Sequence, residues 1–346
     1  MSVGAGVVSV IVVNWNRREL LRACLESLAA QTYAPLEVVL VDNGSTDGSA
    51  EMAEAEFGGR LALTVFRSPV NLGFCAGNNR GIERARGELI ALLNNDAEAG
   101  PEWAAELAAV FEGRPEVGMA ASKILVHEDP KRIDKVGHLI YLDGQNRGRG
   151  TGQIDRGQFD RAEEVLWPDG CAAMYRRAML DEIGLFDEDF FAYADDAELG
   201  LRARIAGWRC MYVPGAVVRH HRGSSLGLLS SRRLQLIERN RILLAVKLFP
   251  LSLLWLNGVY WLARMGAGVW AGATGRGEAA RFPGLGGKVK IAAALVRGNL
   301  SAMPLLPRML SKRRQLRRFR KLTPSQVRRL LLQYRISLGE LSKQAV

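Results

Sequence analysis

The amino-terminal part of the chain alternates short apolar runs with amphipathic stretches. Residues 7–13 form an apolar, β-branched run, which predicts a buried strand. Apolar residues at helical spacing over residues 19–31 predict an amphipathic helix. Such alternation is typical of an α/β fold with a parallel sheet and helices on both faces. The same pattern predicts strands over 36–41, 61–66 and 88–93, and helices over 49–57, up to about 86, and from Pro101.

Four polar residues stand just past the ends of these apolar strands: Asn14, Asp42, Asn71 and Asp96. In a parallel sheet, ligands bind outside the carboxyl ends of the strands. Asn and Asp also form turns wherever they occur, so any one of these residues is equally well read as a turn residue. The four together favour a ligand site at one edge of the sheet.

The middle of the chain is less regular. Residues 123–166 are polar and glycine-rich, and we expect long loops there with one short hairpin. A helix is expected over residues 196–206, with Asp195 and Asp196 at its amino-terminal end. Acidic residues there complement the helix dipole, and a catalytic carboxylate is the alternative.

The chain changes character after residue 225. Residues 248–263 carry no charge and include Trp255, and Trp270 follows closely, as is typical of a membrane interface. Sixteen residues fall short of the length that a spanning helix needs, which is about 20 residues. Residues 281–346 hold 16 Lys or Arg and a single acid, whereas the first 280 residues hold 31 bases and 35 acids.

Such a basic segment suits an anionic lipid surface. Alternatively, the basic segment is an ordinary solvated helix. Nucleic acid is another partner that binds positively charged segments. No nucleic-acid-reading motif accompanies the basic residues, so we expect no nucleic acid partner. We expect a peripheral or monotopic protein at the cytoplasmic face of a membrane.

The cysteines and the first residues of the sequence indicate the cellular compartment. Four separated cysteines form no CxxC pair, which argues against a zinc site or a disulfide framework and fits a reducing cytosol. No Lys or Arg precedes Arg17, so no secretory signal is expected.

The same strand ends carry a family resemblance. The motifs occur in order along about residues 7–225, and together they resemble a family 2 glycosyltransferase of the GT-A fold, in its rhamnosyltransferase-like branch. They are residues 8–16 (VSVIVVNWN), 31–33 (QTY), 41–48 (VDNGSTDG), 71–74 (NLGF), 79–81 (NRG), 93–96 (LNND), 184–196 (GLFDEDFFAYADD), 202, 207–208 and, beyond this range, 238–240 (ERN).

The resemblance implies a catalytic domain over residues 1–225, and the apolar and basic composition described above predicts a helical, membrane-interfacial region over residues 226–346. The resemblance further implies transfer of a sugar, with inversion, from a nucleoside-diphosphate sugar to a hydroxyl of a glycan or lipid-linked acceptor in cell-surface polysaccharide synthesis. On the donor side the implied roles are distributed as follows: Asp42 accepts a hydrogen bond from the base, Val13 and Trp15 flank it, and Asn71, Gly73 and Asn79 line the ribose and diphosphate.

The family's DxD motif falls on Asn94, Asn95 and Asp96, and Asn94 replaces its first acid. Asn94 still suits a ribose hydroxyl, while Asp96 is the carboxylate able to hold Mn²⁺ or Mg²⁺. A downstream segment of the family brings a histidine to the metal, and spacing favours His220 over its neighbour His221. The family's base corresponds to Asp196, beside which Asp195 replaces a glutamate.

Other function classes remain open at this point. A nucleotidyltransferase also builds a nucleotide site on such a sheet, and a membrane-tethered scaffold with a degenerate nucleotide site is a non-catalytic alternative. The asparagine at position 94 is the one hint toward the scaffold. A dinucleotide-dependent dehydrogenase is disfavoured because no GxGxxG follows the first strand.

Overall fold

The structure is a computed structural model that describes residues 6–221, 230–274 and 284–343. The chain divides into two compact units. The first comprises Met1–Gly137 and Gly152–Arg222, and the second comprises His138–Thr151 and Gly223–Val346. The domain boundary predicted after residue 225 falls among residues 222–229, outside the described residues.

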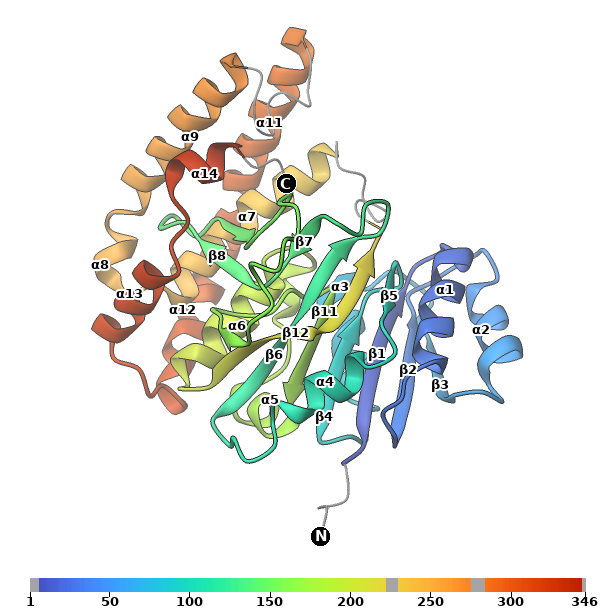
Figure 1. Ribbon diagram of the computed structural model, residues 1–346. Helices are drawn as coiled ribbons and strands as arrows, with labels where there is room; N and C mark the ends of the chain where they lie inside the picture. Colours follow the sequence, from blue (N-terminus) through green and yellow to red (C-terminus); the bar gives the residue numbers. More distant parts are fainter. Residues whose placement is uncertain (1–5, 222–229, 275–283, 344–346) are drawn as a thin grey trace. The chain divides into compact units, whose positions relative to one another are not determined.

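The first unit is built on a ten-stranded sheet (Figure 1). The main order is β10-β12-β6-β11-β4-β1-β2-β3, with β5 paired to β12 and β7 to β6. The strands are β1 Val8–Asn14, β2 Leu36–Asp42, β3 Ala62–Arg67, β4 Leu89–Leu93, β5 Ala97–Ala99, β6 Val117–Val126, β7 Ile133–Lys135, β10 Glu163–Glu164, β11 Ala172–Arg176 and β12 Arg209–His220.

Parallel pairing holds where the sequence predicts it, and beyond β4 the sheet is mixed. Strands β4, β1, β2 and β3 are parallel neighbours, and β6 is parallel to β12. Strand β11 runs antiparallel to both β4 and β6, and so inserts between the two parallel groups. Its first residue, Ala172, therefore pairs with the last residue of β4, Leu93.

Helices cover both faces of this sheet. Alternate β1 residues, such as Val8 and Val10, belong to the core that α1, α2 and α4 close. On the opposite face α3 packs so closely that a Cβ on Gly81 would lie 2.3 Å from Ile11 Cγ2. The helices are α1 Arg18–Ala29, α2 Ser49–Phe57, α3 Gly73–Ile82, α4 Trp103–Ala109, α5 Arg177–Ile183 and α6 Asp195–Ile205, with a 3₁₀ turn at Glu188–Phe190.

The expectation of long loops over residues 123–166 is wrong in part. Strand β6 continues to residue 126, and β7 and β10 also lie in this range. These strands are short or polar, so their apolar periodicity is too weak to reveal them. The single expected hairpin is present as β8 His138–Ile140 with β9 Asn146–Gly148, which belongs to the second unit.

The second unit is otherwise helical. The apolar segment expected at residues 248–263 is divided among three helices, α7, α8 and α9. The described helices are α7 Ser231–Leu248, α8 Leu251–Leu254, α9 Asn257–Ala273, α11 Gly284–Ala302, α12 Leu306–Gln315, α13 Pro324–Gln333 and α14 Leu338–Lys343, with 3₁₀ turns at Met303–Leu305 and Leu316–Arg318.

A buried ion network holds this second unit together. Arg264 pairs with Asp143 (Nε to Oδ2, 2.5 Å) and with Glu238 (Nη2 to Oε2, 2.8 Å). Arg241 pairs with Glu238 at 2.9 Å. Asp143 and Glu238 are fully buried, so each carboxylate relies on these guanidinium groups for its stability inside the protein.

Loss of one guanidinium should therefore destabilise the second unit. We expect Arg264→Met to lower the unfolding free energy by about 3–5 kcal/mol, since it leaves buried carboxylates with too little compensating charge. Urea unfolding followed by circular dichroism measures this. Arg60→Met removes a half-exposed pair with Glu26 and serves as the matched control, with little change expected. Equal midpoints for the two variants would contradict the prediction.

Candidate active site

The carboxyl ends of three parallel strands meet at one edge of the sheet. Asn14 ends β1 and Asp42 ends β2, and the two are register partners. Strand β4 ends beside them and continues directly into residues 94–96. The antiparallel strand β11 brings residues 169–171 to the same edge, where the Asn94 backbone N–H donates to the Cys171 carbonyl (2.8 Å).

Asp42 carries a buried carboxylate oxygen that is able to accept a hydrogen bond from a ligand. Its carboxylate is buried, and Oδ2 accepts from the Ser45 backbone N–H at 3.3 Å. The other oxygen, Oδ1, is buried without a hydrogen-bond partner among the described residues. A buried carboxylate oxygen of this kind is costly unless a ligand donates to it. Trp15, which is 44% exposed, lies just beyond the same sheet edge.

Asn14 and Asn95 form the frame of this edge. The Asn95 amide donates to Asn14 Oδ1 at 2.6 Å, and the Asn14 amide donates to Ser45 Oγ at 3.2 Å. Both asparagine side chains are buried. They therefore tie the loop after β2 to the loop after β4.

The glycine-rich segment before α3 makes close backbone contacts. Asn71 Oδ1 accepts from the Gly73 backbone N–H (2.8 Å) and from the Asn43 amide (3.1 Å). Gly73 has φ +81°, and a Cβ there would lie 2.5 Å from a ring carbon of Phe191. The Phe191 carbonyl in turn accepts from the Phe74 backbone N–H (2.8 Å) at the start of α3. The predicted donor motif thus touches the segment that leads to the acidic pair.

Asn79 is engaged by the protein itself. Its amide nitrogen donates to the Phe186 carbonyl (2.9 Å) and to Glu188 (3.0 Å), and its oxygen accepts from the Phe186 N–H (3.0 Å). In this structure the side chain supports the loop before α6, so the direct contact predicted with the donor needs a rearrangement of these bonds.

Asp96 and His220 form the candidate cation site. His220 Nε2 lies 3.4 Å from Asp96 Oδ1, and His220 Nδ1 lies 2.8 Å from Asp134 Oδ2. Asp96 and Asp134 are buried. A carboxylate on Nδ1 is the usual device that orients a metal-binding histidine and leaves Nε2 for the ion. Asp96 and His220 therefore fit a shared divalent cation.

The electrostatic surroundings of His220 favour the protonated ring, so a bound ion would displace that proton. Burial disfavours the charged ring, but contacts with the Cys171 thiol, Asp134 and Asp96 outweigh it and raise the pKa of His220 well above its ordinary value. Without an ion the ring therefore pairs with the carboxylates as a cation. The adjacent His221 points elsewhere, with its Nε2 3.2 Å from Glu98.

The acidic pair stands on a strained turn. Three non-glycine residues before α6 have positive φ: Phe191 (64°), Tyr193 (70°) and Ala194 (55°). Such conformations cost about 1–3 kcal/mol each and collect at functional sites. The turn buries Asp195 and leaves Asp196 half-buried, with the Asp196 carboxylate accepting from the Ala197 N–H at 2.7 Å.

A third carboxylate joins this pair, and sequence reasoning missed it. An oxygen of Asp169 lies within 4.8 Å of one on Asp196. Lys135 Nζ pairs with Asp169 at 2.7 Å. Burial lowers the pKa of Lys135, but Asp169 and Asp134 outweigh it and hold that pKa above its usual range. Residues 169–171 therefore connect the acidic pair to the surroundings of His220.

Family comparison identifies the class of protein. The model of glycosyl transferase family 2 matches residues 9–184, more than half of the 346 residues. The chain belongs to glycosyl transferase family 2. Membership confirms the resemblance drawn from the motifs and favours transfer of a sugar over transfer of a nucleotidyl group.

Relatives of similar sequence act in glycan synthesis. The chain is 28% identical over 243 residues to the N-acetylglucosaminyl-diphospho-decaprenol L-rhamnosyltransferase of Mycobacterium tuberculosis, covering 64% of this chain and 78% of that protein. It is 32% identical over 231 residues to the O-antigen biosynthesis protein RfbC of Myxococcus xanthus. The match covers only part of two longer relatives. It spans 25% of the length of an uncharacterized Sinorhizobium fredii protein and 18% of the length of RfbC.

Solved structures support the GT-A fold. Staphylococcus aureus TarS residues 1–349 in complex with UDP-GlcNAc matches with TM-score 0.53 at 19% identity, covering 94% of this chain and 91% of that one. A Pyrobaculum calidifontis mannosyltransferase, PcManGT, in complex with GDP-Man and Mn²⁺ matches with TM-score 0.50 at 20% identity, covering 91% and 86%.

The acidic pair predicts a distinctive pH dependence of stability. Burial, then the charges of Asp196 and Asp169, raise the pKa of Asp195 to about 8. Unfolded aspartate has a pKa of about 3.9. At a pH between these two pKa values, Asp195 releases its proton in the unfolded chain and keeps it in the folded chain. The contribution of Asp195 to the unfolding free energy therefore falls as pH rises.

We expect Asp195→Asn to remove this contribution. The stability gain of the variant over the wild type should therefore be larger at pH 8.5 than at pH 5.5. Urea unfolding of both proteins at the two pH values measures it, and titrations common to both proteins cancel. A gain that is the same at both pH values would refute the shifted pKa.

Proposed function

We propose that this chain is an inverting, divalent-cation-dependent glycosyltransferase. It moves a sugar from a nucleoside-diphosphate sugar to a hydroxyl of a glycan or lipid-linked acceptor in cell-surface polysaccharide synthesis. The observation that carries the proposal is the convergence at one sheet edge of the open oxygen of Asp42 and the Asp96–His220 pair. Asp196 is joined to that edge through Asp169.

Asp42 receives the nucleobase in this proposal. Its unpartnered oxygen accepts a hydrogen bond from the base, and Val13 and Trp15 flank the ring. Asn71 and Gly73 follow toward the ribose and diphosphate, where glycine permits close approach of a ligand. Asn79 and Asn95 support this side of the site through their hydrogen bonds within the protein. Asn94 contacts a ribose hydroxyl.

Asp96 and His220 hold the Mn²⁺ or Mg²⁺. The ion, when bound, stabilises the negative charge that develops on the departing diphosphate. Asp134 keeps the ring of His220 aimed at Asp96 through its bond to Nδ1 (2.8 Å).

Asp196 accepts the proton of the attacking hydroxyl. A weak nucleophile of this kind needs a positioned base. Burial and the neighbouring carboxylates raise the pKa of Asp195, which favours its protonated form, and the less buried Asp196 is the member of the pair that we assign as base. The ion pair with Lys135 engages Asp169 (2.7 Å), which makes Asp169 a charged neighbour rather than a second nucleophile.

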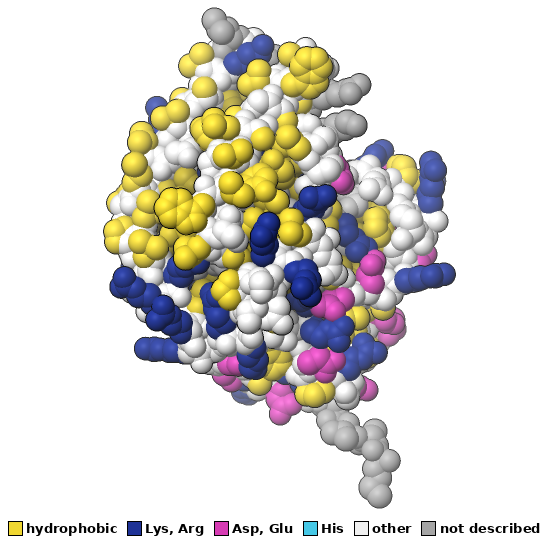
Figure 2. All heavy atoms as spheres, turned by 90° about the vertical axis from the view of Figure 1, so that its left-hand side faces the viewer, with side chains coloured by type: hydrophobic (Ala, Val, Ile, Leu, Met, Phe, Trp, Pro, Cys, Tyr) yellow, Lys and Arg dark blue, Asp and Glu magenta, His cyan; other side chains and the backbone are white. Residues whose placement is uncertain are grey.

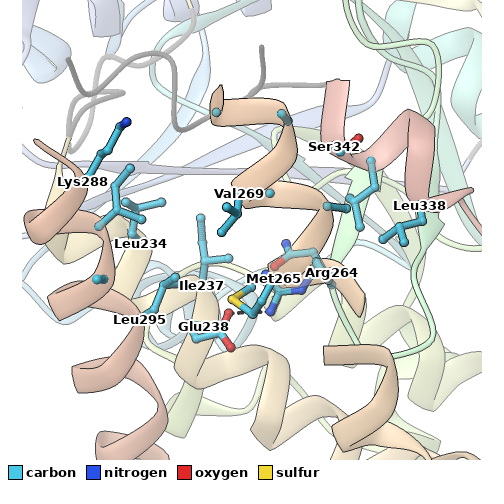
Figure 3. Close-up of a pocket in the computed structure, with 18 of the residues that line it drawn as sticks. Leu234, Ile237, Glu238, Arg264, Met265, Val269, Lys288, Leu295, Leu338 and Ser342 are labelled. Carbon is cyan, nitrogen blue, oxygen red and sulfur yellow. Dashed lines mark hydrogen bonds and ion pairs between the residues drawn. The ribbon is translucent and has the colours of Figure 1, made fainter. Parts of the chain in front are cut away.

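The second unit suggests how a lipid-linked acceptor is reached. A cavity of about 420 Å³ lies between helices α7, α9, α11 and α14 of this unit (Figure 3). Its walls are mainly aliphatic, among them Leu234, Val269 and Leu295, and the Glu238–Arg264 pair lies at one end. Such a volume lies in the range that encloses part of a small ligand. We infer that it receives part of the acceptor's lipid chain.

The second unit also exposes a large apolar surface, to which α8, α9 and the residues between them contribute (Figure 2). Trp255 is 86% exposed, and Val269 and Trp270 are more than 70% exposed. By length and composition, one described helical stretch, Gly286–Arg318, is long and apolar enough to cross a membrane. Apolar contact together with the basic residues of this region gives the two signals that stable attachment to a membrane requires.

The first test concerns the base. We expect Asp196→Asn to slow sugar transfer by about 10²–10⁴-fold while nucleotide affinity changes little, because the change removes only a proton acceptor. Donor candidates come from a thermal-shift screen of nucleotide sugars with Mn²⁺, since a bound donor stabilises the fold. Asp189→Asn, an acid outside the site, is the control. Turnover like the wild type in Asp196→Asn would assign the base elsewhere.

The second test concerns the cation. Asp96→Ala should abolish Mn²⁺-dependent transfer, and EDTA should silence the wild type until Mn²⁺ is restored. His220→Ala should weaken the dependence on Mn²⁺ more than His221→Ala, because only His220 faces Asp96. Full activity in EDTA would exclude the metal, and the reverse order of the histidine variants would exchange their roles.

The third test concerns the membrane. The full chain should co-sediment with vesicles that contain anionic lipid, more weakly but still measurably at high salt, because only the electrostatic part is screened. Trp255→Ala with Trp270→Ala should reduce binding at both salt concentrations. Val70→Ala, an exposed apolar residue of the first unit, should not. A chain that stays in the supernatant with all vesicles would disprove the attachment.

A further inference from the structure

The two adjacent histidines at the end of β12 contact different groups. His220 faces Asp96 and Asp134. His221 directs Nε2 toward Glu98 Oε1 at 3.2 Å. Successive side chains of an extended chain point to opposite faces, so a single site cannot use both rings. His221 therefore remains outside the proposed catalytic cation site.

A third residue completes a cluster around His221. His127 Nε2 lies 3.1 Å from the same Glu98 oxygen, and the rings of His127 and His221 are stacked with centroids 3.6 Å apart. One ligand atom from each of the three residues lies within 4.8 Å of the other two. Glu98 belongs to β5, while His127 and His221 directly follow β6 and β12.

Backbone bonds fix this arrangement. The His127 N–H donates to the His220 carbonyl (3.1 Å), and the His221 N–H donates to the Asp96 carbonyl (2.9 Å). The three side chains are only partly exposed, at 23–32%. The cluster is therefore a built feature of the sheet edge rather than a chance meeting of mobile surface groups.

We propose that Glu98, His127 and His221 form a second cation site, selective for a transition ion of the zinc class. Zinc binds imidazole nitrogen at about 2.0–2.1 Å and carboxylate oxygen at about 2.0–2.2 Å. Two such ligands on one ion are then about 3–3.5 Å apart, as Glu98 Oε1 is from each Nε2 (3.1 and 3.2 Å). Three protein ligands leave a position for water.

The donor set and its surroundings support this choice of ion. Two imidazoles suit zinc, nickel or copper, whereas Mg²⁺ prefers oxygen ligands. Glu128 Oε1 lies 3.3 Å from His221 Nδ1, the carboxylate contact that directs Nε2 toward a metal. The cysteine spacing had argued against a zinc site, but this donor set contains no cysteine.

Such an ion would clamp three strand ends beside the active site. Glu98 and His221 stand two residues and one residue from Asp96 and His220, respectively. Binding should therefore stabilise the folded chain and hold the catalytic pair in place without taking part in the reaction. This site does not depend on the proposed transfer activity.

Zinc titration of the full chain carrying Asp96→Asn tests the site apart from the catalytic one. Calorimetry should show one equivalent of Zn²⁺, and His127→Ala should weaken its binding by more than tenfold. Glu128→Gln should weaken it by about tenfold, as expected for an outer carboxylate. Asp129→Asn, a neighbouring acid paired with Arg132, should bind like the parent. Absence of binding in the parent, or unchanged binding in His127→Ala, would overturn the site.

A second measurement needs no substitution of a metal-ligating residue. Diethylpyrocarbonate labels accessible histidines, and mass spectrometry reads each position. Zn²⁺ should protect His127 and His221 from labelling relative to EDTA, in the wild type and in Asp129→Asn alike. Equal labelling of the two histidines with Zn²⁺ and with EDTA would refute the site even if His127→Ala failed to fold.

Discussion

The contact of His220 with Asp96 and Asp134 is the interaction on which the active-site edge depends. Asp96 follows β4, Asp134 lies in β7 and His220 ends β12. The two carboxylates are buried, and buried charges are tolerated only when they are paired. The pairing therefore joins the parallel strands β4, β1 and β2 to the strands on the far side of β11, and it marks the proposed cation site.

Further contacts extend this edge toward Asp196, the proposed catalytic base. Gly73 lets the ring of Phe191 approach the start of α3, and the Phe191 carbonyl accepts from the backbone of that helix. The chain then passes through the strained residues 193 and 194 into Asp195 and Asp196. Strain of this kind persists only where the surrounding structure enforces it. The proposed donor-binding segment and the proposed catalytic base are thus held by one continuous set of contacts.

Sequence patterns predicted the strands that begin this fold well. The runs at 7–13, 36–41 and 88–93 correspond to β1, β2 and β4, and Ser49–Phe57 is helical as expected. Those strands are almost continuous apolar runs that are buried on both faces, so their sequences reveal them directly. The residues from 123 to 166 were taken for loops because their strands are short and polar. The roles of Asp134, Lys135 and Asp169 were therefore hidden, since each acts through a partner distant in sequence.

The central claim is that a single base at this edge serves one displacement, which inverts the anomeric carbon. Asp169 and Asp196 lie within 4.8 Å of each other, so the sugar chemistry itself must decide between one displacement and two. Proton NMR of the first product formed from the donor found by thermal shift measures its anomeric configuration directly. The account predicts a product of inverted configuration. A product of retained configuration would contradict it and would give Asp169 or Asp196 the role of a covalent nucleophile.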